Sequence, residues 1–203
     1  MRPVRLLVVV MVVAWAAALW AQAATRETPS TPQERKRAIE LTRKLERDPL
    51  GEQATQDRQW LTQWIIEIPD LTVPVCDEVL RPVLVGEMGQ YRYAKELLAQ
   101  QMAGGMAYII QHPQPAEADQ QDDLAINRAG LTSALNAYES LVRTNARGAK
   151  WGPLEKLAEQ RKGGTLEDYI RQATMRCMTG DTITAGLRGA TPRIMPAVAR
   201  GCR

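Results

Sequence analysis

Few residues of this 203-residue sequence could carry acid–base, nucleophilic or metal chemistry: it contains one His and three Cys. A single imidazole excludes a multi-histidine metal site and leaves His112 as the one candidate histidine base. His112 directly precedes Pro113 at the expected end of a long helix, where the helix dipole stabilises a cation. A base would also need an oriented nucleophile, and the sequence has neither Gly-x-Ser-x-Gly nor a Cys–His arrangement. These observations favour a structural role for His112.

The densest acidic group is formed by Asp119, Asp122 and Asp123. On one helix these carboxylates could share a face and supply half of a divalent-cation site, but no second carboxylate group at comparable spacing supplies the other half. Acids at a helix N-terminus are also stabilised by the helix dipole, by about 0.3–1 kcal/mol each. We therefore expect helix-end acids, with no metal and no cofactor. A small metal-dependent or hydrolytic enzyme that uses residues 119–123 is the alternative.

The charge distribution argues against nucleic acid as a partner. The formal net charge is +3, and residues 24–180 carry 20 Lys and Arg against 22 Asp and Glu. The basic excess lies at the ends, with four arginines against Asp181 in residues 181–203. A nucleic-acid-binding protein needs a concentrated basic face on its folded part, and this distribution predicts none.

Residues 1–23 have the pattern of a secretory signal peptide. Two arginines precede an apolar run over 6–20, and the small-x-small sequence 21–23 predicts cleavage after Ala23. The longer stretch 6–24 is nearly 20 residues and could span a bilayer, so an uncleaved N-terminal membrane anchor is the alternative. We expect a periplasmic or secreted protein without membrane insertion after cleavage.

Export makes the cysteines interpretable, because oxidising compartments favour disulfides. Cys76 and Cys177 lie in apolar helical contexts inside the expected folded segment, so we predict a disulfide between them. Cys202 lies one residue from the end of the sequence. It could link two chains into a dimer, remain free or be incidental. No Cys-x-x-Cys motif is present to lower the pKa of a thiol, which argues against redox catalysis.

Apolar periodicity and helix end signals predict an all-α protein of six or seven helices, packed as antiparallel hairpins in an irregular bundle. We expect a linker at 24–30, one helical domain at 31–178 and a flexible basic tail at 179–203. Gly104-Gly105 falls inside a long helix, where close approach of a neighbouring helix or a local kink would explain it. The expected helices cover residues 31–48, 52–66, 76–80, 91–111, 116–144, 153–161 and 165–178.

The aromatic residues offer candidate contact positions. Trp60 and Trp64 follow the apolar stripe of their helix, so we predict that this pair is core and not a ligand platform. Tyr91, Tyr93 and Trp151 are the aromatic positions first considered for binding, on the expectation that they are exposed.

Ala134, Tyr138 and Leu141 resemble the second helix of a tetratricopeptide-type hairpin, over residues 134–141. The Trp, Leu-Gly and Tyr positions of the first helix of that repeat are not matched, and no 34-residue period recurs. At the level of architecture, the chain also resembles small exported all-helical bacterial proteins of unassigned activity. That resemblance implies a fold and assigns no functional residue.

Three functions follow as hypotheses. The first is an exported, non-enzymatic helical protein that binds another protein or a peptide in the bacterial envelope, as a scaffold or binding module. The second is the enzyme alternative built on residues 119–123 or His112. The third is a periplasmic chaperone or stress protein that uses methionine-rich helical surface at Met102 and Met106.

Overall fold

The computed structural model describes residues 28–84, 90–113 and 122–179. Within these ranges the chain is all-helical, with seven helices and no strand, as the sequence predicts. In this part of the chain no helix combines the length and apolar character needed to cross a bilayer. The helices are α2 (Pro32–Arg47), α3 (Ala54–Glu67), α4 (Asp77–Leu84), α5 (Ala94–Gln111), α6 (Asp123–Arg143), α7 (Gly152–Lys162) and α8 (Leu166–Thr179).

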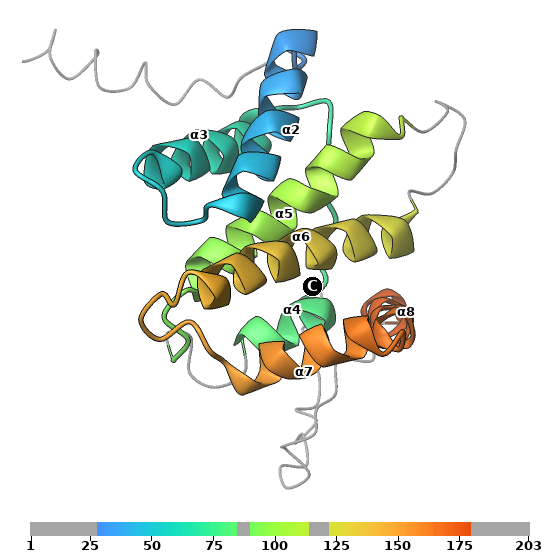
Figure 1. Ribbon diagram of the computed structural model, residues 1–203. Helices are drawn as coiled ribbons and strands as arrows, with labels where there is room; N and C mark the ends of the chain where they lie inside the picture. Colours follow the sequence, from blue (N-terminus) through green and yellow to red (C-terminus); the bar gives the residue numbers. More distant parts are fainter. Residues whose placement is uncertain (1–27, 85–89, 114–121, 180–203) are drawn as a thin grey trace, which may run out of the picture.

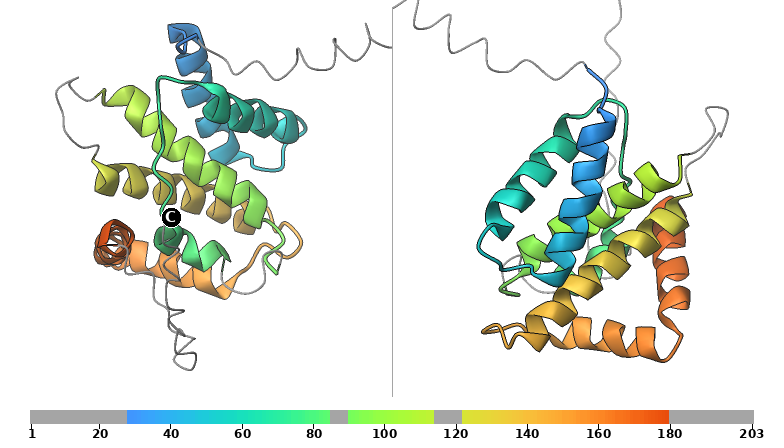
Figure 2. Two further views of the ribbon diagram at one scale, coloured as in Figure 1. Left: turned by 180° about the vertical axis from the view of Figure 1, so that it is seen from behind. Right: turned by 45° about the horizontal axis from the view of Figure 1, so that its top comes forward.

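The helices form three layers, which Figures 1 and 2 show from different sides. The antiparallel pair α5–α6 lies in the middle and makes the most extensive contact in the molecule. The α2–α3 hairpin packs on one side of this pair, while α4, α7 and α8 pack on the other. Two apolar clusters fill the spaces between layers, one around Leu61, Trp64 and Met106, the other around Leu97, Leu135 and Tyr138.

Local sequence signals set several helix ends. Thr31 caps α2 and forms a reciprocal capping box with Glu34, with Pro32 at the first helical position. Asp122 caps α6 by accepting a hydrogen bond from the backbone N–H of Ala125 (3.0 Å), so this helix begins at Asp123. The expectation of a helix start at residue 116 is therefore wrong, because the cap fixes the start.

The central helices approach closely where the sequence places glycine. A Cβ atom added to Gly104 of α5 would lie 2.4 Å from Ser133 Cβ of α6. One added to Gly130 of α6 would lie 2.7 Å from the backbone oxygen of Gln101. Real Cβ atoms do not approach other atoms this closely, so each glycine makes room for the opposing helix. The expected close approach at Gly104 is confirmed.

The predicted cysteine pairing is also confirmed. The Sγ atoms of Cys76 and Cys177 lie at disulfide distance, 1.99 Å, with their Cα atoms 5.8 Å apart. The bond joins the residue before α4 to α8, across 101 positions of sequence. It fastens two helices of the same layer that also contact each other directly.

The α2–α3 layer is fastened at its start by a polar cluster. Ser30 is buried, and both its backbone N–H and its hydroxyl donate hydrogen bonds of 2.8 Å to the carboxylate of Asp70. Arg35 of α2 forms an ion pair with the same carboxylate at 2.7 Å. Ser30 therefore belongs to the folded structure, although the sequence places it in the linker 24–30.

Candidate functional site

A groove of about 590 Å³ lies along α3 and the start of α5. Its α3 wall repeats at helical spacing, through Thr55, Arg58, Thr62 and Ile66. Four such positions span about 16–17 Å along a helix axis. This α3 wall is therefore about three helical turns long. Ile66 and Ala99 are the apolar residues of the lining, and its other residues are polar or charged, so the rest of its carbon surface comes from their aliphatic parts. The α5 wall of the groove is formed by Lys95 and Ala99.

Ile66 is the most exposed large apolar residue among the described positions, with 71% of its surface accessible. Its neighbour Ile65 is 8% accessible and packs in the core between α2, α3 and α5. Trp64 and Ile65 occupy the buried side of α3, and Ile66, about 100° further round the helix axis, points away from the core. Ile66 is left on the groove, where a partner could bury it.

The cationic side of the groove is formed by Arg58 and Lys95, with Glu67 as the acid in its lining. The Arg58 guanidinium donates a hydrogen bond of 2.7 Å from Nη2 to the carbonyl oxygen of Pro49. Its Nε atom is buried and has no hydrogen-bond partner among the described residues. Burial lowers the pKa of Arg58, against the opposing effect of the Glu96 carboxylate. A partner's carboxylate would compensate part of this desolvation.

A second, more polar pocket of about 360 Å³ lies between α2, α5 and α6, with Gly104 in its lining. Its acidic group is Glu46, which accepts hydrogen bonds from Ser133 Oγ (2.5 Å) and Asn136 Nδ2 (3.4 Å). Gln100 Nε2 donates to the same serine at 2.8 Å. Through these hydrogen bonds the Glu46 carboxylate connects α2 to α6.

The aromatic contact candidates do not form an exposed surface. Tyr91 is 3% accessible, Tyr93 is also buried, and Trp151 is half-buried. The Tyr91 and Tyr93 hydroxyls donate hydrogen bonds of 3.0 Å to the carbonyl oxygens of Ala149 and Arg147. Trp151 stacks on Tyr91 with ring centroids 5.5 Å apart. The expected exposure of both tyrosines is wrong, because the segment between α6 and α7 folds over them and takes up their hydroxyl groups.

The other aromatic prediction concerned the Trp60–Trp64 pair. Trp64 is buried in the core, and the two rings stack with centroids 5.8 Å apart. Trp60 is half-buried and is covered by the Arg37 guanidinium, 4.0 Å from the ring centroid. The pair therefore packs α3 against α2.

Among the described residues, His112, Asp122 and Asp123 do not belong to a group whose ligand atoms could share a metal ion. His112 is exposed at the end of α5, where Nδ1 lies 3.0 Å from the carbonyl oxygen of Tyr108 and the two rings stack. Asp122 and Asp123 occupy the cap and first turn of α6. Asp119 lies outside the described residues, as do the signal segment and Cys202. Met106 is buried and Met102 half-buried in the core between layers.

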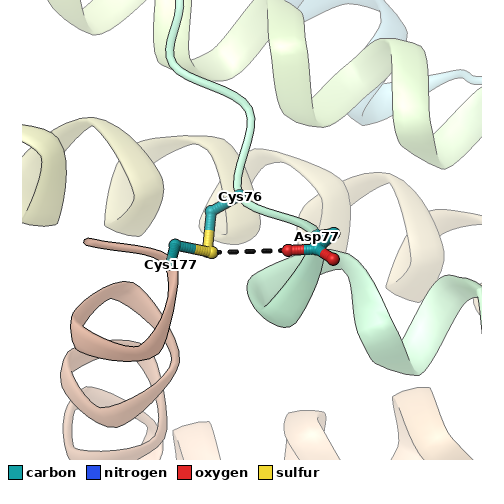
Figure 3. A group of neighbouring side chains, drawn as sticks. All are labelled: Cys76, Asp77 and Cys177. Atoms are coloured by element: carbon teal, nitrogen blue, oxygen red, sulfur yellow. Dashed lines mark hydrogen bonds between the residues drawn. A yellow bond between two sulfur atoms is a disulfide. The ribbon is translucent and has the colours of Figure 1, made fainter. Parts of the chain in front are cut away.

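One group of described residues could offer three metal-binding atoms: Cys76, Asp77 and Cys177, whose ligand atoms lie within 4.8 Å of one another. Figure 3 shows the Asp77 carboxylate turned toward the sulfur pair. Asp77 Oδ1 lies 3.6 Å from Cys177 Sγ. The sequence analysis identified the cysteines and missed Asp77, although its position next to Cys76 was the available signal.

Next to this group lies an ion cluster around one buried carboxylate. Glu78 is 2% accessible and forms an ion pair with Arg81 of the same helix. Arg176 of α8 contacts the same carboxylate through Nε at 3.2 Å. The hydrogen bond from Arg81 lowers the pKa of Glu78, and burial opposes it. The cluster joins α4 to α8 beside the cysteine pair.

Comparison with known proteins identifies no matching family model, curated protein or solved structure. The functional assignment therefore depends on the geometry of the chain itself. The groove was missed from the sequence because it is made by α3 and α5, which are not consecutive. The available signal was Ile66, an apolar residue beside the core stripe of its helix.

Proposed function

We propose that this chain is an exported, non-enzymatic binding protein of the bacterial envelope, which holds an amphipathic helical segment of another protein in the α3–α5 groove. One observation carries the proposal: Ile66, 71% accessible, lies as an apolar anchor in a groove of about 590 Å³ whose other lining residues, apart from Ala99, are polar or charged. Helix-in-groove recognition uses apolar anchors at i, i+3, i+4 and i+7 against such a surface.

The charges of the groove favour an acidic partner. Arg58 and Lys95 line it together with the single acid Glu67, and burial already disfavours the charge on Arg58. A partner helix with an apolar face and flanking Asp or Glu would bury Ile66 and supply a counter-ion. Exposed ion pairs contribute little, so the apolar contact supplies most of the affinity and the charges supply preference.

The experiment uses synthetic amphipathic helical peptides that share one apolar face and differ only in charge: acidic, neutral or basic. Binding to the full chain is measured by fluorescence anisotropy. We expect the acidic peptide to bind most tightly. Burial of an isoleucine side chain is worth about 1.5–3 kcal/mol, so Ile66→Asp should weaken binding at least about tenfold.

The matched control is Met178→Asp, which places the same charge on a 64% accessible apolar residue of α8, a helix without contact to α3 in the described structure. This variant should bind as the unchanged protein does. Lys95→Glu should reverse the preference toward the basic peptide. Equal losses from Ile66→Asp and Met178→Asp, or no binding of any peptide, would refute the groove as the binding site.

A further inference from the structure

The residues around the cysteine pair could also hold a metal ion. We propose that Cys76, Asp77 and Cys177 form a redox-gated Zn²⁺ site. The oxidised pair is the disulfide, and the reduced pair binds the ion together with the Asp77 carboxylate. This site lies between α4 and α8, and the proposal does not depend on the α3–α5 groove.

The donor set fits zinc. Thiolate sulfur and carboxylate oxygen are both zinc ligands, at about 2.3 Å and about 2.0–2.2 Å in tetrahedral geometry. These values place a sulfur and an oxygen ligand about 3.5–3.7 Å apart. Asp77 Oδ1 and Cys177 Sγ lie 3.6 Å apart, so this edge of the tetrahedron is already formed.

The second edge requires the two sulfurs to separate. Two thiolates on one zinc ion stand about 3.8 Å apart, wider than bonded sulfurs. The Cα atoms, 5.8 Å apart, leave room for this separation by side-chain rotation. Cys177 is half-buried and can turn outward, whereas Cys76 is buried with its sulfur 3.6 Å from the carbonyl oxygen of Ala173.

The surroundings orient the ligands. The backbone N–H of Glu78 donates a hydrogen bond of 3.0 Å to Asp77 Oδ1, a contact of the type that holds ligating carboxylates in place. Cys76 directly precedes the first residue of α4, where a helix N-terminus stabilises a thiolate. Asp77 is exposed, so solvent can supply the fourth ligand on that side.

The charge balance also favours a divalent cation. Two thiolates and the Asp77 carboxylate would carry three negative charges. The neighbouring cations Arg81 and Arg176 already form ion pairs with Glu78. Zn²⁺ would neutralise most of the remaining charge.

The gating reaction is a two-electron thiol–disulfide exchange. A dithiol reductant attacks Cys177 Sγ, the more accessible sulfur, and the Cys76 thiolate leaves. The second thiol of the reductant then closes its own disulfide and releases Cys177. Two protons pass from the reductant to the two cysteines, and Zn²⁺ binding releases both to solvent.

The test uses the full chain carrying Cys202→Ser, so that the third thiol cannot contribute. The protein is reduced with dithiothreitol, freed of reductant without oxygen and titrated with Zn²⁺ against a chromophoric chelator. We expect one Zn²⁺ per reduced chain and none per oxidised chain at the same concentration. Co²⁺ in place of Zn²⁺ should give thiolate-to-metal charge-transfer absorption.

Asp77→Asn is the decisive variant because it leaves both cysteines in place. It should weaken Zn²⁺ binding at least about tenfold, because changes to residues that only support a metal ligand already cost about 10–100-fold. Its disulfide content, counted by thiol titration of the oxidised protein, should not change. His112→Ala controls for the imidazole and should bind as before. Equal binding by the oxidised chain, or unchanged binding by Asp77→Asn, would overturn the proposal.

Discussion

Gly104 of α5 lies so close to Ser133 of α6 that a methyl group at the glycine would meet the serine Cβ at 2.4 Å. The same serine donates a hydrogen bond to Glu46 of α2, so this contact lies where three helices meet. Any displacement of Ser133 would therefore be transmitted to the α2–α6 connection.

We accordingly expect Gly104→Ala to destabilise the protein by about 1–3 kcal/mol, the usual cost of overpacking. The higher helix propensity of alanine, about 1 kcal/mol, offsets only part of this cost. Gly152→Ala is the matched control, because a Cβ at that position would have no atom within 4 Å. Urea unfolding followed by circular dichroism measures both; equal stabilities would show that the helices move apart freely at Gly104.

The two adjacent isoleucines of α3 should differ strongly in how the same substitution changes the stability of the protein. Ile66→Asp alters an exposed side chain and should change the free energy of unfolding by no more than about 0.5 kcal/mol. Ile65→Asp buries a carboxylate in the apolar core and should cost more than about 3 kcal/mol. Thermal unfolding of both variants tests this; a large loss from Ile66→Asp would mean that Ile66 supports the fold and does not await a partner.

Low pH should weaken the ion pairs of Glu78 that connect α4 to α8. The pKa of Glu78 is lowered in the folded state by Arg81, so its contribution is complete above its unfolded pKa, about 4.3. This contribution to stability is lost as the pH falls from the unfolded pKa of Glu78 through its lower pKa in the folded state. Glu78→Gln should cost about 1.5–3 kcal/mol at pH 7, toward the lower end because both arginines are partly exposed.

Glu78→Gln should also flatten the loss of stability between pH 5 and pH 3. The control is Glu52→Gln, which changes an exposed acid between α2 and α3. Urea unfolding at a series of pH values compares the three proteins. A Glu78→Gln profile parallel to that of the unchanged protein would refute the role of this carboxylate.

High pH should destabilise the protein through its buried tyrosines. Burial raises the pKa of Tyr91 well above 10, and burial raises the pKa of Tyr169 to about 12. For groups with a raised folded pKa, the contribution to stability is complete below the unfolded value of about 10 and is lost as the pH rises above it. Ultraviolet absorbance should show these phenols ionising only together with unfolding. Tyr91→Phe should remove one such phenol and, by losing the bond to Ala149, cost about 1 kcal/mol.

The local parts of the fold were predictable because their causes are local. The Thr31–Glu34 capping box and the end of a helix before Pro113 each depend on a few adjacent residues. The Cys76–Cys177 pairing followed from where the cysteines fall relative to the expected helices. Burial of Tyr91 could not be predicted in the same way, because it depends on how residues 145–151 return over the start of α5.

The candidate site depends on packing between helices that are distant in sequence. The α3–α5 groove exists because α4 turns away to the opposite layer, which leaves α3 beside α5. A single sequence gives the apolar face of each helix but not its partner. Ile66 was the local sign that α3 has a second apolar position, outside the stripe that the core uses.

The bond between Cys76 and Cys177 closes α4 to α8 into one covalent ring and leaves α2 and α3 outside it. A protease that cuts once inside the ring produces no separate fragment until the bond is reduced. After a cut between α3 and Cys76, no covalent bond holds the N-terminal part, and only its packing against α5 and α6 keeps it in place. The two halves of the molecule therefore differ in how a single break in the backbone is tolerated.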